Sequence, residues 1–191
     1  MKMQNLFIVF CLFLISCESL TENTYEGKNH ITASYRYNEI EKYAKSLDGS
    51  LRLKSISSSN VNYDGASGSW LHMYSKILDS AFTSQYYYFS SCYESIACDS
   101  IVKRKTFVGD AFISQSWFNS DAALKIAEEN GGKQFRTNTA GCNIAATLGQ
   151  AGGPNSSNPF WCIRYSADNN PNNYVMFIIN AVNGSVSKYP K

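Results

Sequence analysis

The sequence is poor in the residues and motifs that most often carry catalysis. It has two histidines, no Cys-x-x-Cys pair, no Gly-x-Ser-x-Gly elbow and no glycine-rich phosphate loop. In enzymes those motifs position a metal, a nucleophile or a phosphate group. Their absence favours a protein that is not an enzyme, and we assign no catalytic residue.

Charge of either sign is also sparse. Lys and Arg number 17 against 15 Asp and Glu, which leaves a formal net charge of +2, and no basic or acidic block occurs. Domains that bind nucleic acid normally carry a basic patch. We therefore expect no nucleic acid partner and only weak electrostatic steering of a ligand.

A long apolar run occurs only at residues 6–15, close behind Lys2. A positively charged start followed by such a run is typical of a secretory signal peptide, and the run is too short to span a bilayer. It ends in Leu14-Ile-Ser-Cys17, which resembles the lipobox of bacterial lipoproteins. The resemblance implies a signal peptide over residues 1–16 and an acylated Cys17 that holds the protein to the membrane. The alternative is an ordinary signal peptide with an unrelated cysteine.

Residues 17–37 are polar and aperiodic, which predicts a flexible lipidated tether. In lipoproteins the residue after the anchor influences sorting, and Glu18 favours the outer membrane over the inner membrane. The resemblance thus implies a lipid-anchored protein of the cell envelope, facing the periplasm or the cell surface.

Four further cysteines predict disulfides, because an even number in an exported chain usually pairs. They are Cys92, Cys98, Cys142 and Cys162. Three pairings are open. We favour Cys92–Cys98, which closes a short loop, together with Cys142–Cys162. The alternative is a zinc site, which only His30 or His72 could complete.

Two segments have the apolar spacing of helices. Asn38 and Glu41 have the spacing of a capping box, and the helix that they begin should stop at Gly49. A second helix should run from Ser120 to Gly131-Gly132. Aromatic and β-branched runs predict the strands, which we place at residues 51–56, 70–74, 86–91, 133–137, 161–165 and 174–179.

Two strings rich in Asn and Asp, at residues 60–65 and 168–173, have oxygen-bearing side chains at alternate positions. A calcium loop of the EF-hand type also needs a glutamate at its twelfth position. Those positions hold Leu71 and Ile179. Both strings are predicted to be turns, and we expect no metal and no cofactor.

The two halves have the same order of elements. Trp70 and Tyr74 have the spacing of Trp161 and Tyr165, and in each half a helix precedes the motif and an aromatic strand follows it. This order predicts an internal duplication with units at residues 38–118 and 119–191. Alternation should place Trp70, His72 and Tyr74 on one face of the sheet, and Trp161, Ile163 and Tyr165 on the corresponding face. The expected fold class is α+β, with helices packed on an antiparallel sheet.

The second unit is similar to a known family. The helix at residues 123–132, the strand with Trp161 and Tyr165, and the segment Val175-Met-Phe-Ile-Ile-Asn-Ala-Val-Asn-Gly-Ser-Val186 resemble PepSY and PepSY-like domains. In that family a helix is followed by strands and a final turn, whose two polar positions are asparagines in this chain. The match covers residues 120–188 well and residues 38–91 less well, so the first unit is interpreted as degenerate. The resemblance implies a binding or inhibitory module.

Aromatic residues are the candidates for such binding. Tyr86, Tyr87 and Tyr88 with His72 form the predicted binding surface, because exposed tyrosines are common at recognition surfaces. The alternative is aromatic pairing within the sheet. The expected partner is an envelope protein, a peptide or a glycan. The alternative function is a structural envelope lipoprotein that self-associates through its sheet edges.

Overall fold

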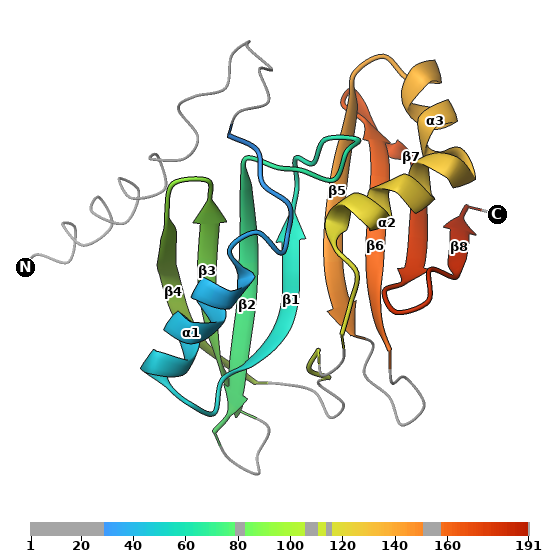
Figure 1. Cartoon of the computed structure of the whole chain (residues 1–191). Helices are drawn as coiled ribbons and strands as arrows, with labels where there is room; N and C mark the ends of the chain where they lie inside the picture. The colour runs from blue at the N-terminus through green and yellow to red at the C-terminus, as the bar shows by residue number, and fades with distance from the viewer. Residues whose placement is uncertain (1–28, 79–82, 106–110, 114–115, 151–157, 191) are drawn as a thin grey trace, which may run out of the picture.

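Figure 1 shows the computed structural model of the chain, which describes residues 29–78, 83–105, 111–113, 116–150 and 158–190. The predicted signal peptide, Cys17 and the first part of the predicted tether lie outside these residues. The described residues form an antiparallel sheet of eight strands with helices against it. The fold is α+β, as expected, but the sheet dominates it.

The N-terminal half consists of one helix and four strands: α1 (Tyr37–Leu47), β1 (Arg52–Ser58), β2 (Ser69–Ile77), β3 (Thr83–Cys92) and β4 (Ile96–Lys105). Helix α1 is amphipathic, and Ile40 and Ala44 on its inner face are fully buried. The predicted capping box is wrong, because Arg36 occupies the N-cap without a side-chain capping hydrogen bond. Glu39 in the first turn pairs with Arg36 instead.

The C-terminal half has the elements α2 (Ser120–Ala127), a kinked helical segment η1 (Glu128–Gly132), α3 (Lys133–Asn138), β5 (Cys142–Gln150), β6 (Pro159–Ala167), β7 (Asn170–Asn180) and β8 (Val186–Tyr189). The first helix ends at Gly131, as predicted, but the predicted strand at residues 133–137 is wrong, because a second helix, α3, begins directly after this residue. Gly131 adopts a φ of 114°, which glycine reaches without strain. The backbone therefore kinks at this residue and then continues as helix α3.

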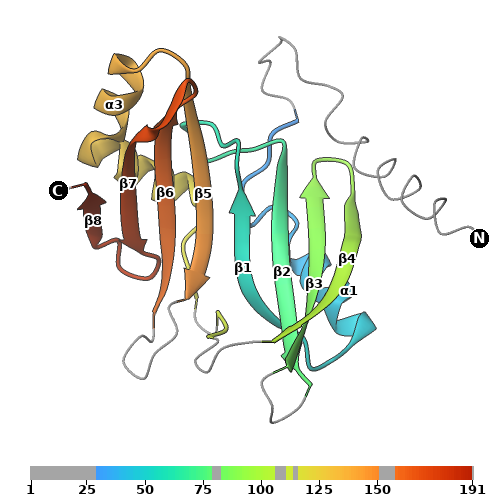
Figure 2. The ribbon, with the colours of Figure 1, turned by 180° about the vertical axis from the view of Figure 1, so that it is seen from behind.

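The strand order in the sheet is β4-β3-β2-β1-β5-β6-β7-β8, and every neighbouring pair is antiparallel. The first strands of the two halves, β1 and β5, pair at the centre of the sheet. Figures 1 and 2 show that α1, α2 and α3 lie on the same side of the sheet. Among the described residues no helix crosses the other side, which we call the open face.

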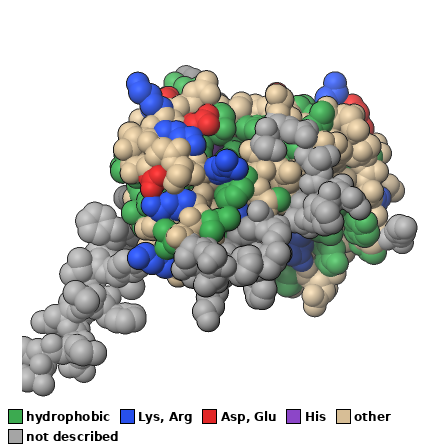
Figure 3. Space-filling model, turned by 90° about the horizontal axis from the view of Figure 1, so that it is seen from below, with side chains coloured by type: hydrophobic (Ala, Val, Ile, Leu, Met, Phe, Trp, Pro, Cys, Tyr) green, Lys and Arg blue, Asp and Glu red, His purple; other side chains and the backbone are tan. Residues whose placement is uncertain are grey.

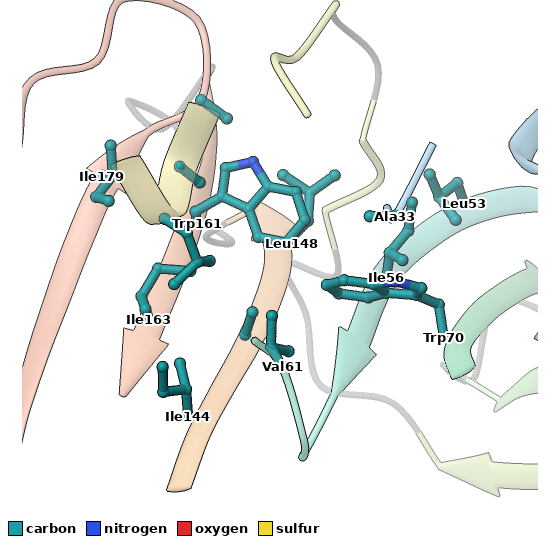
Figure 4. Close-up of a cluster of buried hydrophobic side chains, with 14 of the residues drawn as sticks. Ala33, Leu53, Ile56, Val61, Trp70, Ile144, Leu148, Trp161, Ile163 and Ile179 are labelled. Carbon is teal, nitrogen blue, oxygen red and sulfur yellow. The ribbon is translucent and has the colours of Figure 1, made fainter. Parts of the chain in front are cut away.

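The core lies between the helices and the sheet, and two tryptophans occupy its centre (Figure 4). Trp70, His72 and Tyr74 are buried on the helix-facing side of β2, and Trp161, Ile163 and Tyr165 are buried on the same side of β6. The predicted alternation of both strands is therefore confirmed. Burial of large side chains of this kind is worth about 1.5–3 kcal/mol each, which makes this row a main source of stability.

Ser120 connects the two halves at the first residue of α2. Its hydroxyl donates to the carbonyl oxygen of Gly65 at 2.6 Å and accepts from the amide of Ala33 at 3.0 Å. Ala33 and Ile31 are almost fully buried. The predicted flexible tether is therefore wrong over residues 29–36, which pack against the fold.

No disulfide joins Cys92 to Cys98 or Cys142 to Cys162, so both favoured pairings are wrong. The reason is the alternation of the strands. Cys98 and Cys142 lie toward the core, whereas Cys92 and Cys162 alternate to the open face. Side chains on opposite faces of a sheet cannot bring their Cβ atoms within bonding range.

Candidate binding surface

The predicted binding residue His72 is not at a surface. Its side chain is fully buried between Trp70 and Tyr74, and its Nε2 lies 3.2 Å from the hydroxyl of Ser91. Burial lowers the pKa of His72 to about 4, so the imidazole is neutral at pH 7. His72 is therefore a packed core residue, and its place in the predicted binding surface is wrong.

The three consecutive tyrosines divide between the two faces of β3. Tyr87 points into the core, and Tyr86 and Tyr88 point to the open face. Tyr86 is 9% exposed, with Lys54 Nζ 5.6 Å from the centre of its ring, and Tyr88 is half-buried. A surface made of exposed tyrosines is therefore wrong for Tyr86 and Tyr87, because Tyr87 belongs to the core and Tyr86 is almost fully buried.

The open face offers a different candidate surface. Paired residues on neighbouring antiparallel strands point to the same side, so the registers define one row that crosses all eight strands. We call it the central row. It consists of Ala97, Ser90, Leu71, Ser57, Thr147, Cys162, Ile178 and Ser187, from β4 to β8. With about 4.8 Å between strands, the row is about 34 Å wide.

The central row contains no charged residue, although it lies on the outer face of the sheet. Leu71 is 38% exposed and Thr147 is exposed, while Cys162 and Ile178 are half-buried. The solvated face of an antiparallel sheet usually carries polar and charged residues. Depletion of charge is instead typical of the centre of a protein–protein interface.

Cationic side chains flank the row on both sides. In the N-terminal half, Arg52 and Lys54 lie over the ring of Phe112, at 5.7 and 5.9 Å from its centre. In the C-terminal half, Arg164 lies 4.6 Å from the centre of the Tyr174 ring and donates to the carbonyl oxygen of Pro171 at 2.6 Å. These contacts hold the guanidinium and ammonium groups close to aromatic surface. Figure 3 views the molecule from below and shows that basic and hydrophobic side chains lie next to each other on this lower surface.

One acidic side chain belongs to the same face. Asp99 accepts a hydrogen bond from the Ser90 hydroxyl at 3.0 Å, and burial raises the pKa of Asp99. Arg52, Lys54 and Arg164 are cations on this face, so the described part of the open face is net cationic. It is therefore best matched by a partner that is apolar at the centre and neutral or acidic at the rim.

The described residues contain no group of three His, Cys, Asp or Glu side chains arranged to hold a metal ion. The Asp64-Gly65 turn has the conformation that its sequence predicts, with a φ of 85° at Gly65. None of the helices in the described part of the chain has the length and apolar character needed to cross a membrane.

The residues of the central row were missed because their signal is weak in the sequence. Leu71, Cys162 and Ile178 are apolar residues that lie out of phase with the buried positions of their strands. In a sheet with one solvated face, such residues point outward. The alternation identifies these residues as outward-facing only when the buried positions of β2, β6 and β7 are known.

Comparison of the chain with family models, with curated proteins and with solved structures gives no match.

Proposed function

We propose that this chain is a non-enzymatic binding module of the cell envelope, anchored through acylated Cys17, that holds a protein partner on the open face of its sheet. The observation that carries the proposal is the central row, an uncharged strip across eight strands with exposed Leu71 and Thr147 near its middle. Contiguous exposed surface that includes apolar residues and is rimmed by polar residues often marks a site of protein–protein interaction. Its width is similar to that of the patch that one partner contributes to a stable complex.

The rigidity of the platform supports the same function. The strands that carry Leu71, Thr147 and Ile178 have buried side chains on their other face, so the outward side chains start from an ordered backbone. A preorganised surface loses little conformational entropy on binding. An acylated Cys17 would add anchorage at the membrane without requiring any part of the sheet to bind lipid.

We also propose that the platform arose by internal duplication of a helix and four strands. Trp70 and Tyr74 have the same register relative to β3 as Trp161 and Tyr165 have relative to β7. Each tyrosine also meets a phenylalanine edge to face, Phe89 in one half and Phe177 in the other.

The central pairing of β1 and β5 is consistent with this duplication. When the two halves are matched on these registers, Ser57 corresponds to Thr147, and Ser57 and Thr147 pair with each other. A local two-fold relation between the halves would then pass through the middle of the central row. We propose that both units are PepSY-like in fold.

The experiment uses photo-crosslinking in the envelope of the native host. A photoreactive phenylalanine analogue is placed at position 147 of the full chain, and at Val182 as the control. Val182 is 49% exposed in the turn after β7, away from the central row. We expect one defined protein adduct from position 147 and none from position 182. Adducts of equal identity and yield from both positions would overturn the proposal.

Arginine substitutions inside and outside the central row test the same surface by measuring affinity for the partner. Leu71→Arg and Thr147→Arg should each weaken capture of the adduct partner about tenfold or more, because they place an unpaired charge in the centre of the interface. Val182→Arg should leave capture unchanged. Unchanged capture by both central variants, with unchanged unfolding midpoints, would contradict the proposal.

Self-association through a sheet edge is the second candidate, and one observation favours it. Strand β4 is the edge strand beside β3, and Ile101 on it is 52% exposed. Exposed edge strands with apolar residues pair readily with other chains. Sedimentation of the purified chain distinguishes the candidates: a dimer that Ile101→Lys dissociates supports edge pairing, and a monomer supports the binding module.

A further inference from the structure

A shallow cavity of about 360 Å³, open to solvent, lies in the C-terminal half, between helix α3, the first part of β7 and strand β8. Strand β8 pairs only with Met176–Ile179. Within the described chain, the earlier residues of β7 therefore have no strand on their outer side. The space beside that edge is bounded by α3, and its volume falls within the range of sites that bind small molecules.

Three carboxamide side chains line this cavity: Gln134 and Asn138 from α3, and Asn173 from β7. None of the three amide groups is hydrogen-bonded to another group in the described part of the chain. Each carboxamide offers both donors and an acceptor. Hydroxyl groups have the same dual character, so a ligand with several hydroxyls matches this lining.

Lys188 supplies the cation of the cavity. No Asp or Glu lines the cavity, and within the described chain no carboxylate lies within ion-pairing distance of the Lys188 ammonium. Its Nζ lies 5.9 Å from the centre of the Phe177 ring. The cavity therefore favours an anionic ligand over a neutral or cationic one.

Gly131 makes the room that this ammonium occupies. A Cβ atom at Gly131 would lie 2.7 Å from Lys188 Nζ, and the φ of 114° at Gly131 also disfavours any other residue. The kink at Gly131 thus places backbone without a side chain beside the Lys188 ammonium.

Phe135 and Val175 add apolar surface to the same lining. A ligand that has both a C–H surface and hydroxyl groups would contact the apolar part of the lining and bond to the carboxamides.

We propose that this cavity binds a small hydroxylated carboxylic acid of the sugar-acid class. The carboxylate pairs with Lys188, the hydroxyls bond to Gln134, Asn138 and Asn173, and the ring lies against Phe135. This site is separate from the central row, and it does not depend on the function proposed for the open face.

The test compares sugar acids with their neutral counterparts on the isotope-labelled full chain. Sodium glucuronate and galacturonate are titrated against glucose and galactose, and amide chemical shifts are followed up to about 20 mM, where a millimolar Kd would be saturated. We expect both acids to shift the amides of Gly131, Asn138 and Tyr174, and to bind about tenfold more tightly than the neutral sugars. No shift with either acid, or equal affinity for acid and neutral sugar, would overturn the proposal.

Variants assign the interaction to the cavity. Lys188→Met keeps the apolar stem and should remove the preference for the acids, whereas Lys188→Arg should keep it. Asn138→Ala should weaken acid and neutral sugar alike. Lys125→Met changes an exposed cation of α2 outside the cavity and should have no effect. A preference for the acids that survives Lys188→Met would contradict the assignment, and Thr147→Arg separates this site from the open face because it should leave sugar-acid binding unchanged.

Discussion

Trp70 and Trp161 meet edge to face where the two halves of the molecule join, with ring centroids 6.1 Å apart and ring planes at 73°. Each indole N–H donates to a backbone carbonyl in the segment that leads into the helix of its own half. Trp70 Nε1 donates to Ile31 at 2.8 Å, and Trp161 Nε1 donates to Phe118 at 2.9 Å. The pair therefore connects both halves of the sheet to the start of both helices.

Removal of either indole should destabilise the whole fold. Trp70→Ala and Trp161→Ala should each lower the free energy of unfolding by about 3–5 kcal/mol, because each leaves a cavity in a close-packed core and an unpaired carbonyl. Urea unfolding followed by circular dichroism measures the change. Val182→Ala, at a position 49% exposed, is the control and should stay within about 0.5 kcal/mol of the unmodified chain.

The contact between the two rings is tested by the double-mutant cycle with the milder Trp→Phe variants. We expect a coupling energy of about 0.5–1.5 kcal/mol, the usual contribution of an edge-to-face aromatic pair. Strictly additive effects would show that the rings do not contact each other.

The buried His72 should make stability depend on pH. Burial lowers the pKa of His72 to about 4, against 6.5 for an exposed histidine. Between these values the unfolded chain binds a proton that the folded chain excludes, so stability falls as the pH falls from about 6.5 to about 4. The expected loss over this window is about 3 kcal/mol, at 1.36 kcal/mol per unit of pKa difference.

The measurement is urea unfolding at closely spaced pH values, for the unmodified chain and for His72→Gln. Carboxylates also titrate near the lower end of the window, and the variant retains them. The difference between the two stability curves therefore isolates the imidazole. A constant difference from pH 7 to pH 4 would contradict a buried neutral His72.

Gly132 should not accept a side chain, although it lies within a helical segment. A Cβ atom there would lie 2.6 Å from Cζ of Tyr165, whose hydroxyl donates to Glu128 Oε1 at 2.9 Å. Glu128 also pairs with Arg136 at 2.8 Å. Gly132→Ala must displace the tyrosine from this network, and we expect a loss of about 1–3 kcal/mol.

Gly68→Ala is the matched control, because a Cβ atom at Gly68 has no heavy atom within 4 Å. It should change the free energy of unfolding by less than about 0.5 kcal/mol. Equal effects of the two substitutions would show that the loss comes from the backbone and not from Tyr165.

Much of the fold follows from local pattern. The inward residues of β2 and β6 were predicted from the alternation around Trp70 and Trp161, and the turns at Asp64-Gly65 and Asn183-Gly184 from residues that accept positive φ. The predicted strand at residues 133–137 was wrong because five residues fit either period. Gly131, with a φ of 114°, instead ends one helix and leads directly into the next.

The candidate sites were harder to predict, for a related reason. The favoured disulfides and the tyrosine surface both assumed which residues share a face. Cys92 and Cys98 lie on opposite faces because Cys98 pairs with Phe89, which is three positions from Cys92 on β3 and points into the core. Tyr86 lies on the outer side of β3 and is nevertheless buried, because burial there depends on segments distant in sequence.

The sequence by itself determined which residues alternate, where the glycine and asparagine turns form, and that two helix-and-strand sets follow each other. These properties depend on neighbours within a few positions. Only the tertiary structure decided that β1 pairs with β5, that the helices share one side, and that Leu71, Thr147, Cys162 and Ile178 form a single uncharged row. These contacts join residues that lie about 90 or more positions apart in the sequence. A pattern of neighbouring residues does not predict them, because their energy depends on segments that meet only in the folded chain.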